Sequence, residues 1–96
     1  MTNDNLAMLC DFYEFTMSNG YFKNGFYKRN TYFDVFFRSV PDNGGFAIAA
    51  GLEQLIEYIE ELHFTPEDIK YLHDKGLFDD EFLAYLADFR FTGDIY

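Results

Sequence analysis

The sequence predicts an α+β fold in which a β-hairpin accompanies about four helices, and three observations indicate this class. Residues 31–40 are rich in β-branched and aromatic types, which are typical of strands. Turn-forming residues at 41–45 follow, so the chain can return as a second strand over 46–50. From residue 52 onward, apolar residues recur at helical spacing. Both strands are therefore expected between residues 31 and 50, and helices are expected after residue 52.

The first helix is expected over residues 12–24. Asp11 offers an acceptor at the N-cap position and Glu14 follows three residues later, which is the pattern of a capping box. Gly25 stands where a left-handed residue commonly ends a helix. The alternatives are an earlier start and an earlier end, at Asp4 and Gly20.

The expected strand at 31–40 has two unlike faces, because alternate side chains leave opposite sides of a strand. One face is plainly apolar, with Phe33, Val35 and Phe37. The other face mixes rings with charges: Tyr32, Asp34, Phe36 and Arg38. A two-stranded sheet alone is marginal in water. The hairpin therefore needs further partners, and we expect the chain to be an incomplete part of a longer protein.

Three helices are expected after the hairpin. The first has an apolar face with 3.6-residue spacing, made of Leu52, Leu55, Ile56, Ile59 and Leu62. The second begins with Thr65 as N-cap and Pro66 at the first helical position, and ends at Gly76. The third begins near Asp79 and is expected to bury Phe82, Leu83, Leu86 and Phe89.

Composition limits the classes of function. The net charge of −10 argues against nucleic acid and against an anionic membrane surface, because both need a basic footprint. No apolar run approaches the length of a membrane span. The single cysteine, Cys10, allows no intrachain disulfide and suits a reducing compartment, so a cytoplasmic protein is expected. The bases that favour an anionic ligand gather in the first half: Lys23, Lys28, Arg29 and Arg38.

Most residues with reactive side chains have a structural interpretation. Cys10 ends an apolar run that begins at Leu6 and is expected in the core, as free cysteines usually are. His63 falls at a helix C-terminus and His73 within a helix, and neither has a partner at metal-binding spacing. The glutamates at 57, 60 and 61 are interpreted as a solvated face. Asn43-Gly44-Gly45 is interpreted as a hairpin turn in preference to a phosphate cradle.

Two features could bind a ligand. Asp11 and Tyr13 stand at a helix start, where unpaired N–H groups favour an anion and the Tyr13 ring can lie on a flat heteroaromatic. Arg38 ends the mixed face of the strand, and arginine binds phosphate with paired donors. The structural alternatives are an ordinary cap with a packed ring, and a surface arginine. These residues fit a flat anionic ring and a phosphate without identifying a reaction.

The ordered motifs resemble the N-terminal part of nicotinate phosphoribosyltransferases. The opening Leu9-Cys10-Asp11-Phe12-Tyr13-Glu14-Phe15-Thr16-Met17 resembles the family's "L-T-D-x-Y-E-L-T-M". Each later block is weak alone, but together they follow the family's order: Gly20-Tyr21-Phe22, Phe33-Asp34-Val35-Phe36-Phe37-Arg38, Asn43-Gly44-Gly45-Phe46-Ala47, Ala50-Gly51-Leu52-Glu53, Leu77-Phe78 and Phe89-Arg90-Phe91-Thr92-Gly93-Asp94.

The resemblance implies an enzyme that joins nicotinate to 5-phosphoribosyl-1-pyrophosphate with ATP and Mg²⁺, forming nicotinate mononucleotide for NAD salvage. It implies an N-terminal α+β domain beside an irregular α/β barrel, in a homodimer with shared active sites. Residues 1–96 would be part of that N-terminal α+β domain, without the barrel. Because the family's catalytic histidine belongs to the barrel, the segment alone is expected to be inactive and to bind no cofactor.

The resemblance also implies residue roles. Tyr13 is expected to stack on the pyridine ring across the dimer interface, with Asp11 beside it, and Arg38 to match a phosphate-contacting position of the related nicotinamide enzymes. Cys10 replaces the family's usual threonine. The alternatives are a nicotinamide or quinolinate phosphoribosyltransferase, or a non-catalytic acidic interaction module.

Overall fold

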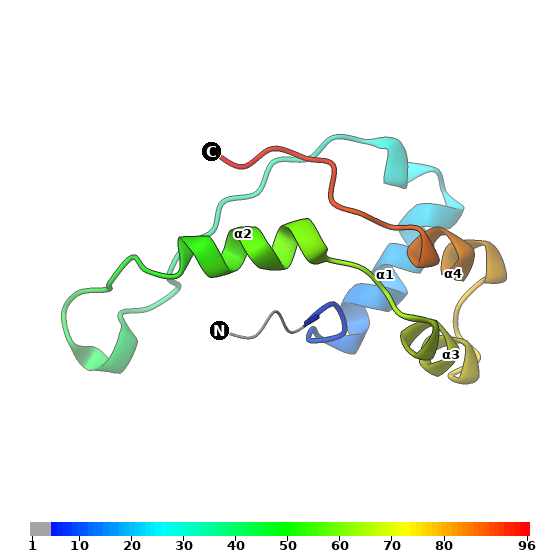
Figure 1. The fold of residues 1–96 in the computed structure, drawn as a ribbon, viewed down its shortest axis with the longest axis horizontal. Helices are drawn as coiled ribbons and strands as arrows, with labels where there is room; N and C mark the ends of the chain where they lie inside the picture. Colours follow the sequence, from blue (N-terminus) through cyan, green and yellow to red (C-terminus); the bar gives the residue numbers. More distant parts are fainter. Residues whose placement is uncertain (1–4) are drawn as a thin grey trace.

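The structure, a computed structural model, describes residues 5–96 and contains four α-helices in that range (Figure 1). These are α1 (Phe12–Lys23), α2 (Leu52–Glu61), α3 (Pro66–Asp74) and α4 (Asp80–Ala87), with two short 3₁₀ helices, η1 (Phe26–Lys28) and η2 (Pro41–Asn43). All four α-helices lie where the sequence predicts them. The alternative start of the first helix at Asp4 lies outside the described residues. Within residues 5–96, no helix has the length and apolar character needed to cross a membrane.

Helices α1, α3 and α4 pack together and hold the core. Leu72 of α3 is completely buried, and the other core residues surround it from α1 and α4: Phe15, Phe82, Leu83 and Leu86. Rings from the connecting segments extend this core, as Phe64 does by meeting Phe15 edge-on at 6.0 Å between centroids. We call α1, α3 and α4 together the helical unit.

The start and end of α3 follow from local signals. Thr65 Oγ1 accepts the N–H of Asp68 at 3.1 Å, and the Asp68 carboxylate accepts the N–H of Thr65 at 2.9 Å. This reciprocal capping box satisfies backbone donors that the helix itself leaves unpaired. At the other end Gly76 has a φ of 71°, a left-handed conformation that glycine adopts without strain.

The predicted β-hairpin is wrong, because residues 5–96 contain no β-strand. Residues 31–40 instead run extended with their side chains in solvent, and Tyr32 and Val35 are 90% and 96% exposed. A strand is stabilised by a neighbour that pairs with its N–H and C=O groups and covers one face. Residues 46–50 do not come alongside to supply one. The described chain is therefore all-helical with long extended segments, and the α+β class is corrected accordingly.

The turn between the two expected strands nevertheless forms. The N–H of Gly44 donates to the carbonyl of Pro41 at 3.0 Å, and Asp42 and Asn43 both have positive φ angles, 55° and 53°. Two central residues with positive φ are characteristic of the turns that match the twist of paired strands. The local prediction of a hairpin turn is thus sound, whereas the strand pairing that should accompany it is missing.

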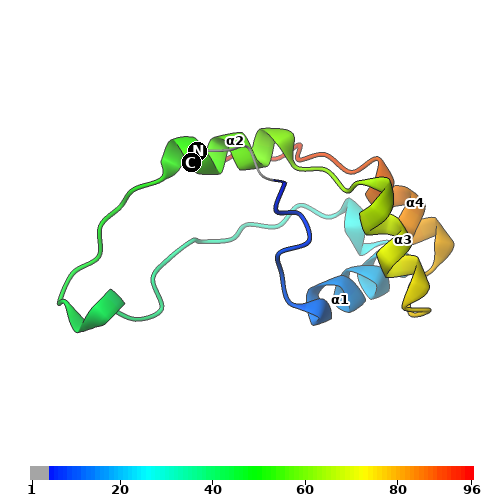
Figure 2. The same cartoon turned by 60° about the horizontal axis from the view of Figure 1, so that its bottom comes forward.

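Helix α2 and the extended segment before it lie away from the helical unit. In Figures 1 and 2, η2 is at the opposite end of the molecule from α3 and α4. Within residues 5–96, α2 packs against no other helix, and much of its apolar face is exposed, as at Leu52, Leu55 and Ile56. The radius of gyration is 15.8 Å, compared with about 13 Å for a compact domain of similar length. Much of the apolar surface is therefore left uncovered.

Candidate functional site

The N-terminus of α1 holds two of the predicted site residues. Asp11 is the N-cap, and its carbonyl accepts the N–H of Glu14 at 3.0 Å. Its carboxylate forms no capping hydrogen bond, so the capping box predicted for Asp11 and Glu14 is wrong. The Glu14 side chain hydrogen-bonds the Cys10 thiol instead of reaching back to the Asp11 N–H. The Asp11 side chain is exposed beside the start of the helix.

Tyr13 lies in the first turn of α1 and is 59% exposed. Its carbonyl accepts a hydrogen bond from Thr16 Oγ1 at 2.9 Å, while its ring remains available. The preceding residue, Phe12, instead packs edge-on against Phe78 at 5.8 Å between centroids. Successive residues of a helix point about 100° apart, so neighbouring rings can serve different surfaces. The ring of Tyr13 thus faces solvent from a helix that is itself anchored.

Arg38 is exposed in the extended segment between η1 and η2. Its guanidinium forms no ion pair or hydrogen bond with any of residues 5–96. The structure thus brings Asp11 and Tyr13 together at the start of α1. It leaves Arg38 on a segment that leads away from the helical unit (Figure 1).

Cys10 is exposed, which corrects the prediction that it belongs to the core. Partial burial of the thiol raises its pKa above the ordinary value, and the charge of Glu14, the hydrogen bond with Glu14 and the charge of Asp11 raise it further. The reactive form of cysteine is the thiolate. A raised pKa keeps Cys10 protonated near neutral pH, so it is poorly suited to nucleophilic catalysis.

The two histidines lie near the C-terminal ends of α2 and α3. His63 Nδ1 lies 2.7 Å from the carbonyl of Glu61, the last residue of α2, so the ring hydrogen-bonds the exposed end of that helix. His73 lies in the last turn of α3, with Asp74 and Asp80 at 3.6 and 3.9 Å. No group of three or more His, Cys, Asp or Glu side chains is gathered in the part of the chain that the structure describes.

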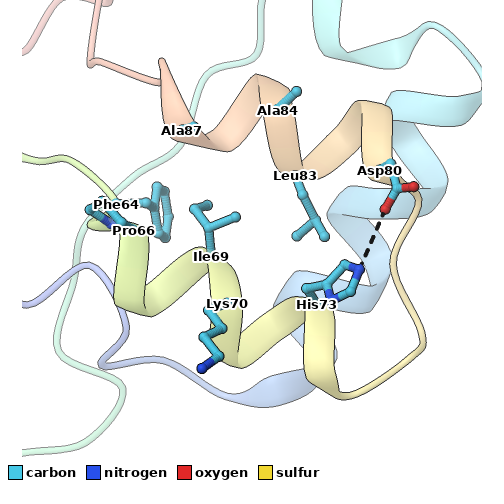
Figure 3. A pocket seen from close by; sticks show the side chains of 9 residues that line it. All are labelled: Phe64, Pro66, Ile69, Lys70, His73, Asp80, Leu83, Ala84 and Ala87. Atoms are coloured by element: carbon cyan, nitrogen blue, oxygen red, sulfur yellow. Dashed lines mark ion pairs between the residues drawn. The ribbon is translucent and has the colours of Figure 1, made fainter.

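A groove lies between α3 and α4, and the sequence analysis did not predict it (Figure 3). Three polar side chains, Lys70, His73 and Asp80, also line it. The rest of the lining is apolar: Phe64, Pro66, Ile69, Leu83, Ala84 and Ala87. The apolar periodicity of each helix was visible in the sequence. The groove depends on how two helices meet, which no single stretch of sequence encodes.

Comparison with known proteins identifies the family. The model of the nicotinate phosphoribosyltransferase (NAPRTase) N-terminal domain matches residues 8–96. The chain belongs to this family. Because the match runs through almost the entire sequence, it confirms the resemblance drawn from the ordered motifs. No solved structure matches the chain.

Nicotinate phosphoribosyltransferases of several organisms are similar to the chain. One from Mycobacterium tuberculosis is 39% identical over 90 residues, which cover 94% of this chain and 19% of that protein. One from Bacillus subtilis is 37% identical over 81 residues, covering 84% of this chain and 16% of that protein. One from Caenorhabditis elegans is 42% identical over 65 residues, covering 68% of this chain and 12% of that protein. The chain therefore spans less than a fifth of the length of these relatives.

Proposed function

We propose that this chain acts as the N-terminal part of an enzyme that forms nicotinate mononucleotide from nicotinate and 5-phosphoribosyl-1-pyrophosphate in NAD salvage. The observation that carries the proposal is the match of residues 8–96 to the N-terminal domain of nicotinate phosphoribosyltransferases. Relatives with that name occur in bacteria, a nematode and a plant. Since the chain covers only a small share of them, it supplies part of a site that other residues complete.

Tyr13 and Asp11 are the residues we assign to the pyridine. The ring of Tyr13 is exposed on a helix anchored to a core, so it can stack on a flat heteroaromatic without a large rearrangement. The positive end of the α1 dipole lies beside it and favours a carboxylate such as that of nicotinate. Asp11 is also anionic and stands at the N-cap. We assign it a place beside the bound ring, where its carboxylate can accept hydrogen bonds from donors that the rest of the enzyme supplies.

Arg38 is the residue we assign to a phosphate. Its guanidinium, which pairs with none of residues 5–96, can donate two parallel hydrogen bonds to phosphate oxygens. Transfer to the pyridine nitrogen breaks the bond between the anomeric carbon and pyrophosphate, while positive charge develops on the ribose. The two substrates must be aligned for this step, and such alignment can lower the barrier by several kcal/mol. Positioning is thus the contribution we assign to this segment.

The shared site implies a homodimer, in which Tyr13 of one subunit meets a pyridine enclosed partly by the other. Its exposure is the observation that supports this arrangement. We also propose that the full-length enzyme uses ATP and Mg²⁺ and that the parts outside this segment bind them. A cytoplasmic location is our proposal from the single cysteine, which suits a reducing compartment.

A chimera tests the proposed function directly. Residues 8–96 replace the matching segment of the Mycobacterium tuberculosis relative, and the chimera and the 96-residue chain are assayed in parallel. We expect the chimera to form nicotinate mononucleotide and the isolated chain to be inactive. A chimera that folds and assembles like the parent but has no activity would contradict the proposal.

The same proteins separate the alternative functions. Activity with nicotinamide or quinolinate in place of nicotinate would indicate a related phosphoribosyltransferase. A free-standing interaction module would instead be a monodisperse 96-residue protein that melts cooperatively, with no shift on adding nicotinate or 5-phosphoribosyl-1-pyrophosphate. The exposed apolar side chains of the extended segment argue against such a module, because patches of this kind promote association.

A further inference from the structure

Helix α1 has two apolar faces. The face towards the rest of the helical unit carries three rings and two polar side chains: Phe12, Phe15, Phe22, Asn19 and Lys23. The residues at 13, 17 and 21 are half-exposed, and at 100° per residue they centre roughly opposite that face. Because both faces are apolar, burial alone favours neither rotation of the helix strongly. A directional interaction, such as a hydrogen bond, is needed to determine which face of α1 turns inward.

Asn19 supplies a directional contact. Its side-chain oxygen accepts the backbone N–H of Asp79, the N-cap of α4, at 3.1 Å. The two residues are 60 positions apart in sequence, and the bond is partly buried. A hydrogen bond weakens steeply when its angle deviates, whereas apolar packing is non-directional. This bond therefore restrains the rotation of α1 about its axis in a way that the surrounding rings do not.

The other contacts between these elements are more tolerant. Lys23 Nζ lies 3.6 Å from a carboxylate oxygen of Asp79, but both side chains are about half exposed, and such pairs contribute little. Phe22 meets the rings of Phe82 and Tyr85 at 5.9 and 5.1 Å between centroids, with tilted and stacked geometries. Aromatic pairs are favourable over a range of offsets and interplanar angles. Asn19 is thus the most specific restraint on this helix.

We infer that Asn19 is a positioning residue for the pyridine site, acting through Tyr13. By accepting the Asp79 N–H, it holds α1 in the rotation that turns the Tyr13 ring outward. The inference rests on the proposed function, since the ring is taken to stack on nicotinate. Displacement of a binding group by about 1 Å can cost up to a hundredfold in rate, so a small rotation of α1 is enough to matter.

Three substitutions in the chimeric enzyme test the inference. Asn19→Leu removes the acceptor while keeping the branched shape of the side chain, and is expected to raise the nicotinate KM roughly tenfold, a change of the order of one lost hydrogen bond. The KM for 5-phosphoribosyl-1-pyrophosphate should not change. Asn19→Asp keeps an acceptor at the positive end of α4 and should restore the nicotinate KM. Ser18→Ala is the matched control, because its hydroxyl bonds only Glu14 of the same helix.

A double-mutant cycle decides whether Asn19 acts through Tyr13. In the Tyr13→Ala background, Asn19→Leu should cause no further rise in the nicotinate KM, although both variants can lower the melting temperature. A merely structural role predicts a lower melting temperature with an unchanged KM in Asn19→Leu, and that result overturns the inference. If Tyr13→Ala itself leaves the nicotinate KM unchanged, the assignment of the pyridine site fails and the inference fails with it.

Discussion

Phe22 of α1 stacks on Tyr85 of α4, with ring centroids 5.1 Å apart and planes inclined by 26°. Tyr27 also contacts both rings, at 4.7 and 5.3 Å between centroids, so three aromatic side chains join the end of α1 to the middle of α4. Together with the buried core around Leu72, this cluster holds α1 against α4.

Phe22→Ala is expected to lower the free energy of unfolding by about 3 kcal/mol, because it removes a ring that packs on three others. Urea denaturation followed by circular dichroism measures the change. Tyr21→Ala is the matched control on the same helix, with a half-exposed ring, and should cost roughly 1 kcal/mol or less. Equal losses in the two variants would contradict the packing described for α1.

The two helix N-caps, Thr65 and Asp11, are expected to differ in their effect on stability. Thr65→Ala removes a side chain that accepts a backbone hydrogen bond, and should cost about 1 kcal/mol. Asp11→Ala removes a side chain that makes no capping bond and should cost much less. Thermal melting of the two variants gives the comparison. A larger loss for Asp11→Ala would show that its carboxylate caps α1 after all.

Cys10 is expected to react slowly with iodoacetamide at pH 8, although it is exposed, because partial burial and then Glu14 raise its pKa. Glu14→Gln removes a nearby negative charge, so the pKa should fall and the reaction at pH 8 should accelerate. Glu53→Gln, on α2, is the control and should leave the rate unchanged. A rate that is insensitive to Glu14→Gln would exclude the electrostatic explanation.

The raised pKa of Cys10 also has a consequence for stability. The folded chain holds the thiol proton more tightly than the unfolded chain does. The stabilisation is therefore fully present below the ordinary thiol pKa and is lost as the pH rises through the folded-state pKa. In Cys10→Ser, the free energy of unfolding should therefore fall less steeply as the pH rises.

Residues 31–40 are expected to exchange their amide hydrogens at nearly unprotected rates in the 96-residue chain. Within the part of the chain that the structure describes, their backbone groups make no hydrogen bonds in a sheet or helix, whereas those of α3 and α4 do. Hydrogen–deuterium exchange with mass spectrometry distinguishes the segments. Strong protection of residues 31–40 would mean that the strand pairs after all.

Tyr13→Ala and Arg38→Ala are expected to affect different substrates in the chimera. Loss of the Tyr13 ring should raise the KM for nicotinate and lower kcat, since stacking both binds and orients the pyridine. Loss of the Arg38 guanidinium should raise the KM for 5-phosphoribosyl-1-pyrophosphate by about tenfold or more, as expected for a charge-assisted pair. Steady-state kinetics with each substrate varied in turn measures both. Unchanged kinetics would remove the substituted residue from the site.

Local signals in the sequence predicted the helices well. Thr65 and Pro66 begin α3, and Gly25 and Gly76 take the left-handed conformations expected just after α1 and α3. The turn at Pro41–Asn43 was predictable for the same reason. Each of these features depends on a few neighbouring residues and on backbone conformations that their side chains favour. The ordered motifs likewise identified the family, because they lie in the sequence itself.

Other properties were decided only by the tertiary structure. The strand predicted at 31–40 has the right composition, yet strands require a partner and none comes alongside. Cys10 follows a run of apolar residues but is exposed, because the described chain covers it only in part. The outward direction of Tyr13 depends on how α1 meets α4, where Asn19 and Asp79, 60 positions apart in sequence, share a hydrogen bond. Short-range conformational preferences are carried by the chain itself, whereas pairing, burial and side-chain direction depend on which distant segments meet.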